Sequence, residues 1–256
     1  MERIRKPFQG VRNIIRFNWH FYLLATVTVT LMLWVATMLH HPLTVYVNLI
    51  TCLVIATTTI SLLVSLYIYD LSNLYSLNWL DGLNLNTGTG SKLFNINAGF
   101  DETSHLLQQK YPSASLQAFD FYDPAKHTEI SIKRARSAYP AYGNTIAVTT
   151  SSLPLETQSA DAIFLLFAAH EIRDDDERAV FFNELSRVLK STGKVIVTEH
   201  LRNKPNFLAY NIGFLHFLSK ASWYRTFRAA YFTIETETKI TPFITTFTLI
   251  KNGTAS

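Results

Sequence analysis

The residues of this chain that could do chemistry follow short apolar runs. Gly99 comes just after residues 93–97 (LFNIN), and Asp120 ends residues 116–120 (LQAFD). If these runs are strands of an open α/β sheet, both residues lie at its carboxyl edge, where ligands bind. A carboxylate at the position of Asp120 can accept the ribose hydroxyls of an adenosyl group. It can equally cap a turn or a helix, so Asp120 alone is a weak signal.

A second group of polar residues follows two later apolar runs. His170 and Glu171 come after residues 161–167, while Glu199 and His200 close residues 194–199. A histidine and a carboxylate on one rim can exchange protons with a bound substrate, which makes His170 and Glu171 the candidate catalytic residues. The alternatives are a packing role for His170 in a helix-start turn and solvated loop positions for Glu171 and His200.

Metal binding is not expected from the sequence. No group of Cys, His, Asp and Glu residues has convincing metal-ligand spacing, and Cys52 is the single cysteine of the chain. A lone cysteine also leaves no disulfide framework to constrain the fold.

The elements that must position these residues alternate between two patterns. Short apolar runs are separated by longer helical patterns, which predicts a Rossmann-like, doubly wound parallel α/β sheet. Two runs of period two at the C-terminus flank a turn at Thr241-Pro242 and predict an antiparallel hairpin. The expected strands are residues 93–97, 116–120, 145–149, 161–167, 194–199, 232–240 and 244–250. The expected helices are residues 102–110, 126–135 and 176–190, the last with acids at its start and Gly193 just past its end.

A long uncharged stretch precedes these elements. Between Phe17 and Tyr69 there is no Asp, Glu, Lys or Arg over 53 residues, whereas one membrane span needs roughly 20 apolar residues. The His-His-Pro segment 40–42 interrupts the stretch, so we predict a transmembrane helical hairpin over residues 19–39 and 43–69. The alternatives are a helical hairpin buried in a soluble core and a cleaved signal peptide, whose apolar region would be ~7–15 residues.

The excess of positive charge is confined to the start of the chain. The chain has 23 Lys and Arg against 19 Asp and Glu, and residues 1–16 hold five of these bases and one acid, leaving 18 of each. Because positive residues stay on the cytoplasmic side, we expect the N-terminus and the α/β domain to be cytoplasmic. The basic arm is expected to face anionic lipid headgroups, and its charge does not indicate nucleic-acid binding.

These patterns predict four regions. They are a basic cytoplasmic arm (1–16), the two-helix transmembrane hairpin (17–69), a juxtamembrane helix and linker (70–90, with the helix over 70–85), and the α/β domain (91–256). Residues 204–232 are aromatic and basic, and form either a helix packed on the sheet or a lid that enters the membrane interface. Threonines in both spans could support pairing into a homo-oligomer.

One region of the sequence resembles a known family. Residues 153–155 (LPL), followed after four residues by 160–163 (ADAI), look like the LPF…SFD signature of class I S-adenosylmethionine-dependent methyltransferases. Residues 184–194 (ELSRVLKSTGK) are similar to the family's E-x-x-RVLKPGG segment. The resemblance covers roughly residues 90–251 and is closest to the small-molecule branch that includes ubiquinone and menaquinone methyltransferases. It implies S-adenosyl-L-methionine as the cofactor.

The resemblance also implies where the cofactor binds. The implied cofactor-binding residues are Asn95, Asn97, Ala98, Gly99, Asp120, Phe121, Thr150, Ser151 and Phe167. Several positions depart from the family's pattern. Asn95 stands where the family has an acid, and Asn97 and Asp101 stand where it has glycines. Thr149 or Thr150 stands where the family usually has an acid that holds the adenine amino group. Asn tolerates positive φ, and Gly99 still lets backbone approach a ligand closely. We therefore expect a weakened cofactor site rather than none.

Together these features predict a membrane-anchored methyltransferase that faces the cytoplasm. Its expected partners are the lipid bilayer and a lipophilic small-molecule acceptor, such as a quinone precursor, a phenolic lipid or a lipid-linked intermediate. The rival is a degenerate, non-catalytic methyltransferase fold that acts as a binding or scaffold protein, which the altered first loop would suit. A nicotinamide-dependent dehydrogenase would suit Asp120, but the chain lacks the G-x-G-x-x-G motif.

Overall fold

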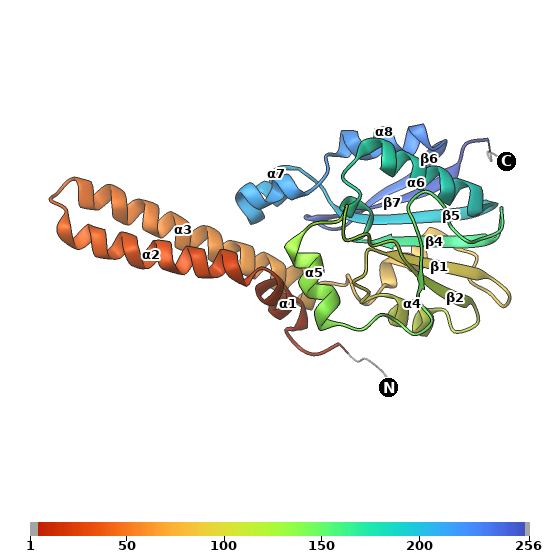
Figure 1. The fold of residues 1–256 in the computed structure, drawn as a ribbon, viewed down its shortest axis with the longest axis horizontal. Helices are drawn as coiled ribbons and strands as arrows, with labels where there is room; N and C mark the ends of the chain where they lie inside the picture. Colours follow the sequence, from red (N-terminus) through yellow and green to blue (C-terminus); the bar gives the residue numbers. More distant parts are fainter. Residues whose placement is uncertain (1–4, 254–256) are drawn as a thin grey trace.

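A computed structural model describes residues 5–253, which form an α/β domain with a long helical hairpin extending from it (Figure 1). The domain contains a seven-stranded sheet of order β3-β2-β1-β4-β5-β7-β6. β1 to β5 pair in parallel, while β7 runs antiparallel to both β5 and β6. This confirms the Rossmann-like sheet with an antiparallel C-terminal hairpin. The strands are β1 (Lys92–Asn97), β2 (Ser115–Asp120), β3 (Ile146–Ala147), β4 (Ala160–Leu166), β5 (Leu189–His200), β6 (Phe232–Thr241) and β7 (Ile244–Lys251).

Helices cover both faces of the sheet, as a doubly wound fold requires. On one face α6 (Asp175–Val188) and α8 (Lys220–Ala229) bury a cluster that includes Phe182 and Trp223. On the other face α4 (Ser104–Lys110) and η2 (Asn78–Leu83) pack against the strands. Because it is covered on both sides, β4 is an almost continuous buried apolar run. The remaining domain helices are α5 (Ile130–Ala138), η3 (Ala169–Glu171), α7 (Lys204–Tyr210) and η4 (Asn211–His216).

The start of α6 follows the sequence prediction, but its end does not. Asp174 caps the helix by accepting a hydrogen bond from the Glu177 backbone N–H at 2.7 Å. The helix ends at Val188, and Gly193 lies within β5 instead of just past the helix. A Cβ at Gly193 would lie 2.9 Å from the carbonyl oxygen of Ala160. The glycine is therefore needed because β4 and β5 approach each other closely, not because a helix ends there.

Two other sequence expectations are corrected. The expected strand over residues 145–149 is only Ile146–Ala147, which pairs with the end of β2 at the edge of the sheet. The expected helix over residues 70–85 is broken into η1 (Tyr67–Leu71) and η2, with Leu77 at a φ of +56° between them. Leu74 packs in one apolar cluster and Leu77 in another. A single straight helix could not bury Leu74 and Leu77 in two separate clusters, so the chain bends between them.

A helix that the sequence patterns did not predict lies within the basic arm. α1 (Gln9–Phe17) buries one side and packs against α5 and against the end of the hairpin. Its last residue, Phe17, lies edge-on to Phe100 and Tyr139, with ring centroids 5.5 and 6.3 Å away. α1 therefore connects the hairpin to the loop that follows β1.

The hairpin has the helices expected from the uncharged stretch. α2 (Trp19–Met38) and α3 (Leu43–Leu66) lie side by side, and α3 continues into η1 (Figure 1). Both segments are long and apolar enough to cross a membrane. None of the residues of α2 is buried, and only Thr51 and Ser65 are buried in α3. The hairpin is therefore not buried in the core of the α/β domain, which is evidence against that alternative.

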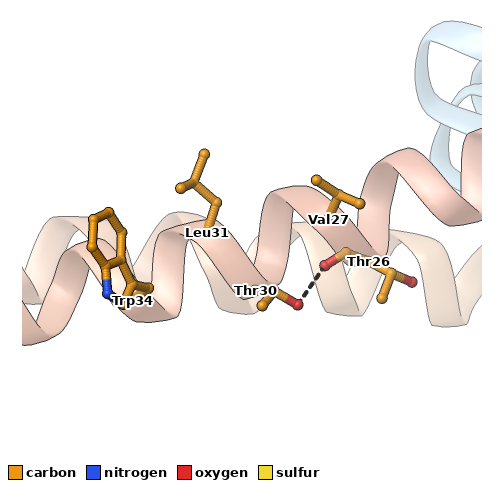
Figure 2. Close-up of a pocket in the computed structure, with 5 residues that line it drawn as sticks. All are labelled: Thr26, Val27, Thr30, Leu31 and Trp34. Carbon is orange, nitrogen blue, oxygen red and sulfur yellow. Dashed lines mark hydrogen bonds between the residues drawn. The ribbon is translucent and has the colours of Figure 1, made fainter.

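The outer surface of the hairpin carries one shallow hollow. It has a volume of about 360 Å³ and is lined by five residues of α2: Thr26, Val27, Thr30, Leu31 and Trp34 (Figure 2). The hydroxyl of Thr30 donates to the carbonyl oxygen of Thr26 at 2.9 Å. Since a single helix lines it and its hydroxyl groups bond to that helix, the hollow is a gap between side chains on an apolar surface.

Candidate cofactor and active site

The chain turns sharply at the end of β1, where the resemblance implied a cofactor loop. The Asn97 side-chain oxygen accepts a hydrogen bond from the Gly99 backbone N–H at 2.7 Å, and Gly99 has a φ of +87°. Glycine adopts this φ without strain. The side-chain NH₂ of Asn97 is buried and has no hydrogen-bond partner within residues 5–253. Because a buried donor without a partner is costly, this NH₂ group is suited to contact a ligand.

The carboxylate of Asp120 lies beside this turn but is already paired. Asp120 is the register partner of Asn97, and its Oδ2 accepts a hydrogen bond from Arg136 of α5 at 2.5 Å. The Arg136 guanidinium also lies 4.3 Å from the ring centroid of Tyr122. A Cβ at Gly99 would collide with this guanidinium. Arg136 therefore occupies the space through which a nucleotide would reach both Gly99 and Asp120.

Asn95 is placed differently from a ligand-binding residue. It is buried in β1, and its side-chain NH₂ donates to the hydroxyls of Thr103 and Ser104 at 3.0 and 2.8 Å. Asp101 accepts hydrogen bonds from the backbone N–H groups of the same two residues, both at 2.9 Å. Asn95 and Asp101 thus hold the start of α4. The side-chain NH₂ of Asn95 is already hydrogen-bonded, so that of Asn97 is the one more available to a ligand.

The remaining implied cofactor residues are spread along the edge. Ala98 and Phe121 are buried in the main apolar cluster. The hydroxyl of Thr150 donates to Glu177 at 2.5 Å, whereas Ser151 is exposed. Phe167 follows β4 with a φ of +55° and packs against Tyr69 and His200. The structure therefore brings Asn97, Gly99 and Asp120 together. Thr150 and Ser151 lie apart from them, in the loop that follows the short strand β3.

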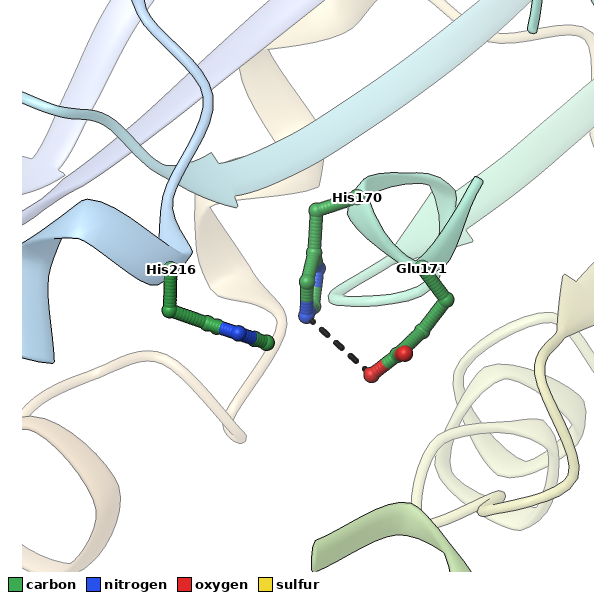
Figure 3. A group of neighbouring side chains, drawn as sticks. All are labelled: His170, Glu171 and His216. Atoms are coloured by element: carbon green, nitrogen blue, oxygen red, sulfur yellow. Dashed lines mark ion pairs between the residues drawn. The ribbon is translucent and has the colours of Figure 1, made fainter. Parts of the chain in front are cut away.

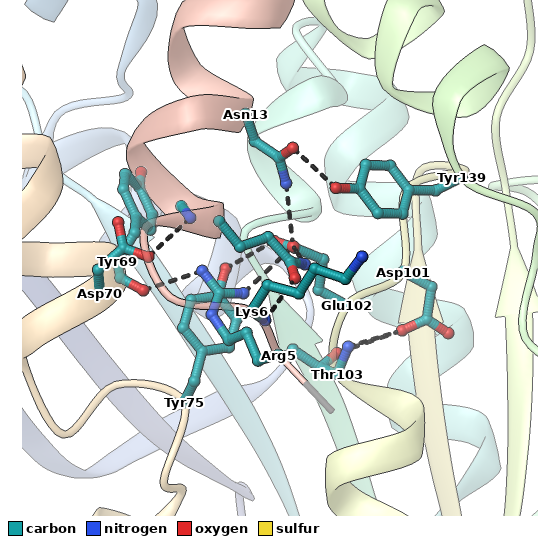
Figure 4. Close-up of polar contacts among 12 residues, drawn as sticks. Arg5, Lys6, Asn13, Tyr69, Asp70, Tyr75, Asp101, Glu102, Thr103 and Tyr139 are labelled. Carbon is teal, nitrogen blue, oxygen red and sulfur yellow. Dashed lines mark hydrogen bonds and ion pairs between the residues drawn. The ribbon is translucent and has the colours of Figure 1, made fainter. Parts of the chain in front are cut away.

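A largely covered carboxylate, 12% exposed, connects the arm, the segment that follows the hairpin and the domain. Glu102 accepts hydrogen bonds from Arg5 at 3.2 Å, Gln9 at 3.1 Å, Asn13 at 3.2 Å and Tyr75 at 2.9 Å (Figure 4). The Arg5 guanidinium also lies 3.4 Å from the ring centroid of Tyr75. Burial, with the nearby Glu102 carboxylate, holds the pKa of Tyr75 well above its usual value, so its hydroxyl remains a donor. Arg5 thus faces inward, which corrects the expectation that the whole arm faces lipid headgroups.

A second carboxylate fastens α1 to η1. Asp70 accepts hydrogen bonds from the backbone N–H groups of Gly10 and Val11, both at 2.8 Å (Figure 4). A Cβ at Gly10 would collide with the side chain of Tyr69. The close approach of α1 and η1 therefore depends on this glycine.

The segment between η1 and η2 fills the space at the end of β4. Only about 10 Å³ remains between the side chains of this segment, such as Leu74 and Leu77, and those of Phe167 and Thr198. A cavity of this size holds one water molecule at most. The chain itself therefore closes this part of the carboxyl edge.

The polar residues expected after β4 and β5 do come together. His170 Nδ1 lies 2.7 Å from Glu199 Oε2, and its Nε2 lies 3.5 Å from Glu171 Oε1. Burial alone would lower the pKa of His170, but the two carboxylates outweigh it and raise the pKa to about 10. His170 is therefore positively charged at neutral pH, and it can accept a proton only after losing the one that it holds.

Glu171 and His200 are buried, which corrects the interpretation of both as solvated loop residues. The Glu171 side chain is 6% exposed. His200 lies 2.8 Å from the hydroxyl of Tyr69 and 3.1 Å from the side-chain oxygen of Asn206, and it stacks on Phe217. Burial lowers the pKa of His200 to about 3, so this ring is neutral and packs between the hairpin and the domain.

A third histidine, which the sequence patterns did not single out, completes this rim. His216, at the end of η4, has its ring centroid 5.2 Å from that of His170. Figure 3 shows that His170, Glu171 and His216 point toward one another. One potential ligand atom from each lies within 4.8 Å of the others. Spacing along the sequence did not indicate this group, because His216 is distant in sequence from His170 and Glu171.

Comparison with known proteins supports the fold identified above. The family model described as a methyltransferase domain matches residues 105–197. The structure is similar to a SAM-dependent methyltransferase from Aquifex aeolicus, with a TM-score of 0.51 and 15% identity, covering 75% of this chain and 97% of that one. It is also similar to a putative type 11 methyltransferase from Sulfolobus solfataricus, with a TM-score of 0.47 and 16% identity, covering 71% and 92%. No curated protein sequence matches the chain.

The chain therefore has the class I methyltransferase fold, with the strand order and antiparallel last strands expected for it. The family match begins after Gly99. The turn in which the sequence departs from the family's pattern thus lies outside the matched residues, while the LPL and ELSRVLKSTGK segments lie within them.

Proposed function

We propose that this protein is a membrane-anchored, S-adenosylmethionine-dependent methyltransferase that acts on a lipophilic small molecule. The observation that carries the proposal is the turn at Asn97 and Gly99, which lies beside Asp120 at the carboxyl edge of a sheet with methyltransferase strand order. In open α/β sheets this edge is where ligands bind.

The residues at this edge fit the cofactor on one condition. Gly99 allows backbone to approach a ligand, the unpartnered NH₂ group of Asn97 offers a donor, and Asp120 can accept two ribose hydroxyls. The condition is that Arg136 leaves Asp120, which a partly exposed, flexible side chain can do. S-adenosylmethionine would supply an electrophilic methyl group, whose bond to sulfur breaks as the bond to the acceptor forms.

The candidate catalytic residues lie at the end of β4 on the same edge of the sheet. Glu199 holds Nδ1 of His170, while Nε2 lies 3.5 Å from Glu171 Oε1, so this nitrogen and the Glu171 carboxylate lie side by side where an acceptor could contact both. We propose that the charged His170 orients the acceptor and that the Glu171 carboxylate accepts its proton during transfer, because methyl transfer otherwise depends mainly on alignment.

The membrane part of the proposal is supported by where apolar side chains are exposed. The hairpin of α2 and α3 is long and apolar enough to span a membrane and is almost entirely unburied by the domain. α7 contacts α3, and the segment of α7 and η4 exposes Leu208 (69%) and Ile212 (82%). α8, in contrast, buries Trp223 against the sheet. We propose that α7 and η4, the first part of the segment 204–232, enter the membrane interface, while α8 packs on the domain.

Cofactor binding is tested by calorimetry on the full chain in detergent. We expect S-adenosylmethionine to bind below millimolar concentration and Asp120→Asn to weaken binding at least about tenfold, since a charged acceptor is lost. Asp176→Asn, an exposed acid in the first turn of α6, is the matched control and should bind like the wild type. If neither the wild type nor Arg136→Ala binds at millimolar ligand, the enzyme proposal is refuted and the scaffold alternative is favoured.

The acceptor class is tested separately. The purified chain is incubated with methyl-labelled S-adenosylmethionine and either total membrane lipids or the water-soluble extract of the same cells. Label should appear in the organic phase. Label only in water-soluble products would refute the lipophilic acceptor while leaving the methyltransferase activity in place.

A further inference from the structure

Three potential metal ligands from two distant parts of the chain share one space. His170 and Glu171 belong to η3, just after β4, and His216 ends η4. One nitrogen or oxygen atom from each residue lies within 4.8 Å of the others. Their side chains converge in Figure 3, where His170 stands between Glu171 and His216.

The surroundings of His170 are those of a metal ligand. Its Nδ1 is held by Glu199 Oε2 at 2.7 Å, and Glu199 is buried. A carboxylate on one ring nitrogen fixes the imidazole and leaves the other nitrogen directed at the metal, as is usual for metal-bound histidines. Here the other nitrogen is Nε2, which lies 3.5 Å from Glu171 Oε1 and would lose its proton on coordination.

An unpartnered atom in this space points independently to a ligand. Oε2 of Glu171 is buried and has no hydrogen-bond partner in the part of the chain that the structure describes, and the side chain is 6% exposed. A buried carboxylate oxygen without a partner is costly, so such an oxygen in a native structure calls for a missing ligand.

The formal charges also favour a cation. Glu171 and Glu199 contact His170, and Glu129 Oε1 lies 3.3 Å from His216 Nδ1. Arg173, whose nitrogen lies 3.6 Å from Glu129, is the nearby residue with a permanent positive charge. Once His170 has given up its proton to coordinate a metal, three carboxylates against one guanidinium leave two negative charges, which a divalent cation would balance.

We propose that His170, Glu171 and His216 form a binding site for a divalent transition-metal cation. Two imidazoles and one carboxylate are the donor set of Zn²⁺, Fe²⁺ and similar ions, whereas Mg²⁺ and Ca²⁺ prefer all-oxygen sites. Three protein ligands leave further coordination positions open, as in catalytic metal sites. The inference goes beyond the proposed function, since cation binding requires neither S-adenosylmethionine nor methyl transfer.

If the proposed function also holds, the cation orients the acceptor in place of His170 and Glu171, which then act as its ligands. An open coordination position can take an acceptor oxygen, and a divalent cation stabilises the anionic form of that oxygen. An acceptor with a hydroxyl group would then lose its proton more readily before it receives the methyl group. This role rests on the proposed function, whereas the binding site does not.

Arg173 competes with the cation. Its guanidinium donates to the carbonyl oxygen of His216 and lies against the His216 ring. It must move away from the ring for His216 to coordinate a metal. Removing this charge should therefore strengthen binding, which gives a variant whose expected effect is opposite in sign to the loss of a ligand.

The experiment uses the full chain in detergent, purified without a histidine tag and stripped with a chelator, with no S-adenosylmethionine present. Zn²⁺ binding is measured by competition with a chromogenic chelator, and Co²⁺ is added as a spectroscopic probe of ligand geometry. We expect one Zn²⁺ per chain. His216→Ala and Glu171→Gln should each weaken binding at least about tenfold, and Arg173→Gln should tighten it. Melting temperatures establish that each variant is folded.

His41→Ala is the matched control, because His40 and His41 form an exposed histidine pair in the hairpin turn. It should leave Zn²⁺ binding unchanged. The proposal is overturned if neither the wild type nor Arg173→Gln binds Zn²⁺, if His216→Ala binds as tightly as the wild type, or if His41→Ala abolishes binding. Since the cofactor is absent from the assay, none of these results depends on whether the chain is a methyltransferase.

Discussion

Replacing Arg136 with alanine should tighten the binding of an adenosyl ligand. In the structure the guanidinium pairs with Asp120 at 2.5 Å and covers Gly99, so a ligand that uses both residues must first displace it. The substitution removes a competitor from the site and leaves Asp120 free to accept ribose hydroxyls. Few substitutions of an arginine are expected to tighten ligand binding, so a lower Kd would be specific evidence that Arg136 blocks the site.

The size of the effect follows from what must be broken. The side chains of Arg136 and Asp120 are 35% and 16% exposed, so their ion pair resembles a surface pair, worth up to about 1 kcal/mol. The guanidinium over the Tyr122 ring, at 4.3 Å, adds roughly 0.5–1 kcal/mol. Removing Arg136 therefore spares the ligand about 0.5–2 kcal/mol, which is roughly a 2- to 30-fold decrease in Kd.

Calorimetry with S-adenosylmethionine measures this change, with Lys133→Ala as the control. Lys133 lies on the same helix and is exposed, so its substitution should leave Kd unchanged. An unchanged Kd in Arg136→Ala would show that the ligand does not displace the guanidinium. A weaker Kd would show that Arg136 is itself a ligand contact. Either result refutes the reasoning given for this site.

Three further predictions concern stability and membrane insertion. Glu102→Ala leaves the guanidinium of Arg5 without its carboxylate, and the two side chains are 18% and 12% exposed. The substitution should lower the free energy of unfolding by roughly 1.5–3 kcal/mol in a urea titration in detergent, because hydrogen bonds to a charged group are lost. A loss below about 1 kcal/mol would be that of an exposed pair and would contradict this partial burial. Burial lowers the pKa of His200 to about 3, from ~6.5 in the unfolded chain, so the stability that it contributes is complete above pH ~6.5 and is lost as the pH falls toward 3. Between pH 6.5 and 5 the unfolding free energy of His200→Gln should therefore change less steeply than that of the wild type, and equal slopes would be evidence against this burial. Leu31→Arg in α2 should reduce the fraction of the chain that resists carbonate extraction from membranes, because a charge near the centre of a span costs roughly 2.5–3.5 kcal/mol. Ser151→Arg on the exposed surface of the domain should have no such effect, and equal extraction of both variants would argue against a span at α2.

The sequence predicted most elements of the fold because the patterns that carry it are local. A strand of the covered sheet is an apolar run, a terminal hairpin alternates with period two, and Asp174 marks the start of α6 whatever lies around it. The exceptions are instructive. The segment 70–85 has helical spacing, but Leu74 and Leu77 pack in different apolar clusters, and tertiary burial overrode the local preference.

The candidate site was predicted only in part, for a related reason. Gly99 and Asp120 could be identified because each follows an apolar run, and strand ends in a parallel sheet meet at one edge. Arg136 gave no signal, since an arginine in the middle of a helix is ordinary until its helix is placed over the turn at Gly99. Glu102 gave none either, although four side chains from two distant segments, the arm and residues 70–85, converge on it.

Composition and periodicity by themselves determined that this chain has an apolar hairpin, an α/β sheet and a polar carboxyl edge, because these properties are set by neighbouring residues. Only the tertiary structure decided which polar residues meet. It buried Glu171 and His200, placed Arg136 on Asp120, and brought His216 from η4 to His170 after β4. Such meetings depend on how distant segments pack, and no spacing along the chain records them.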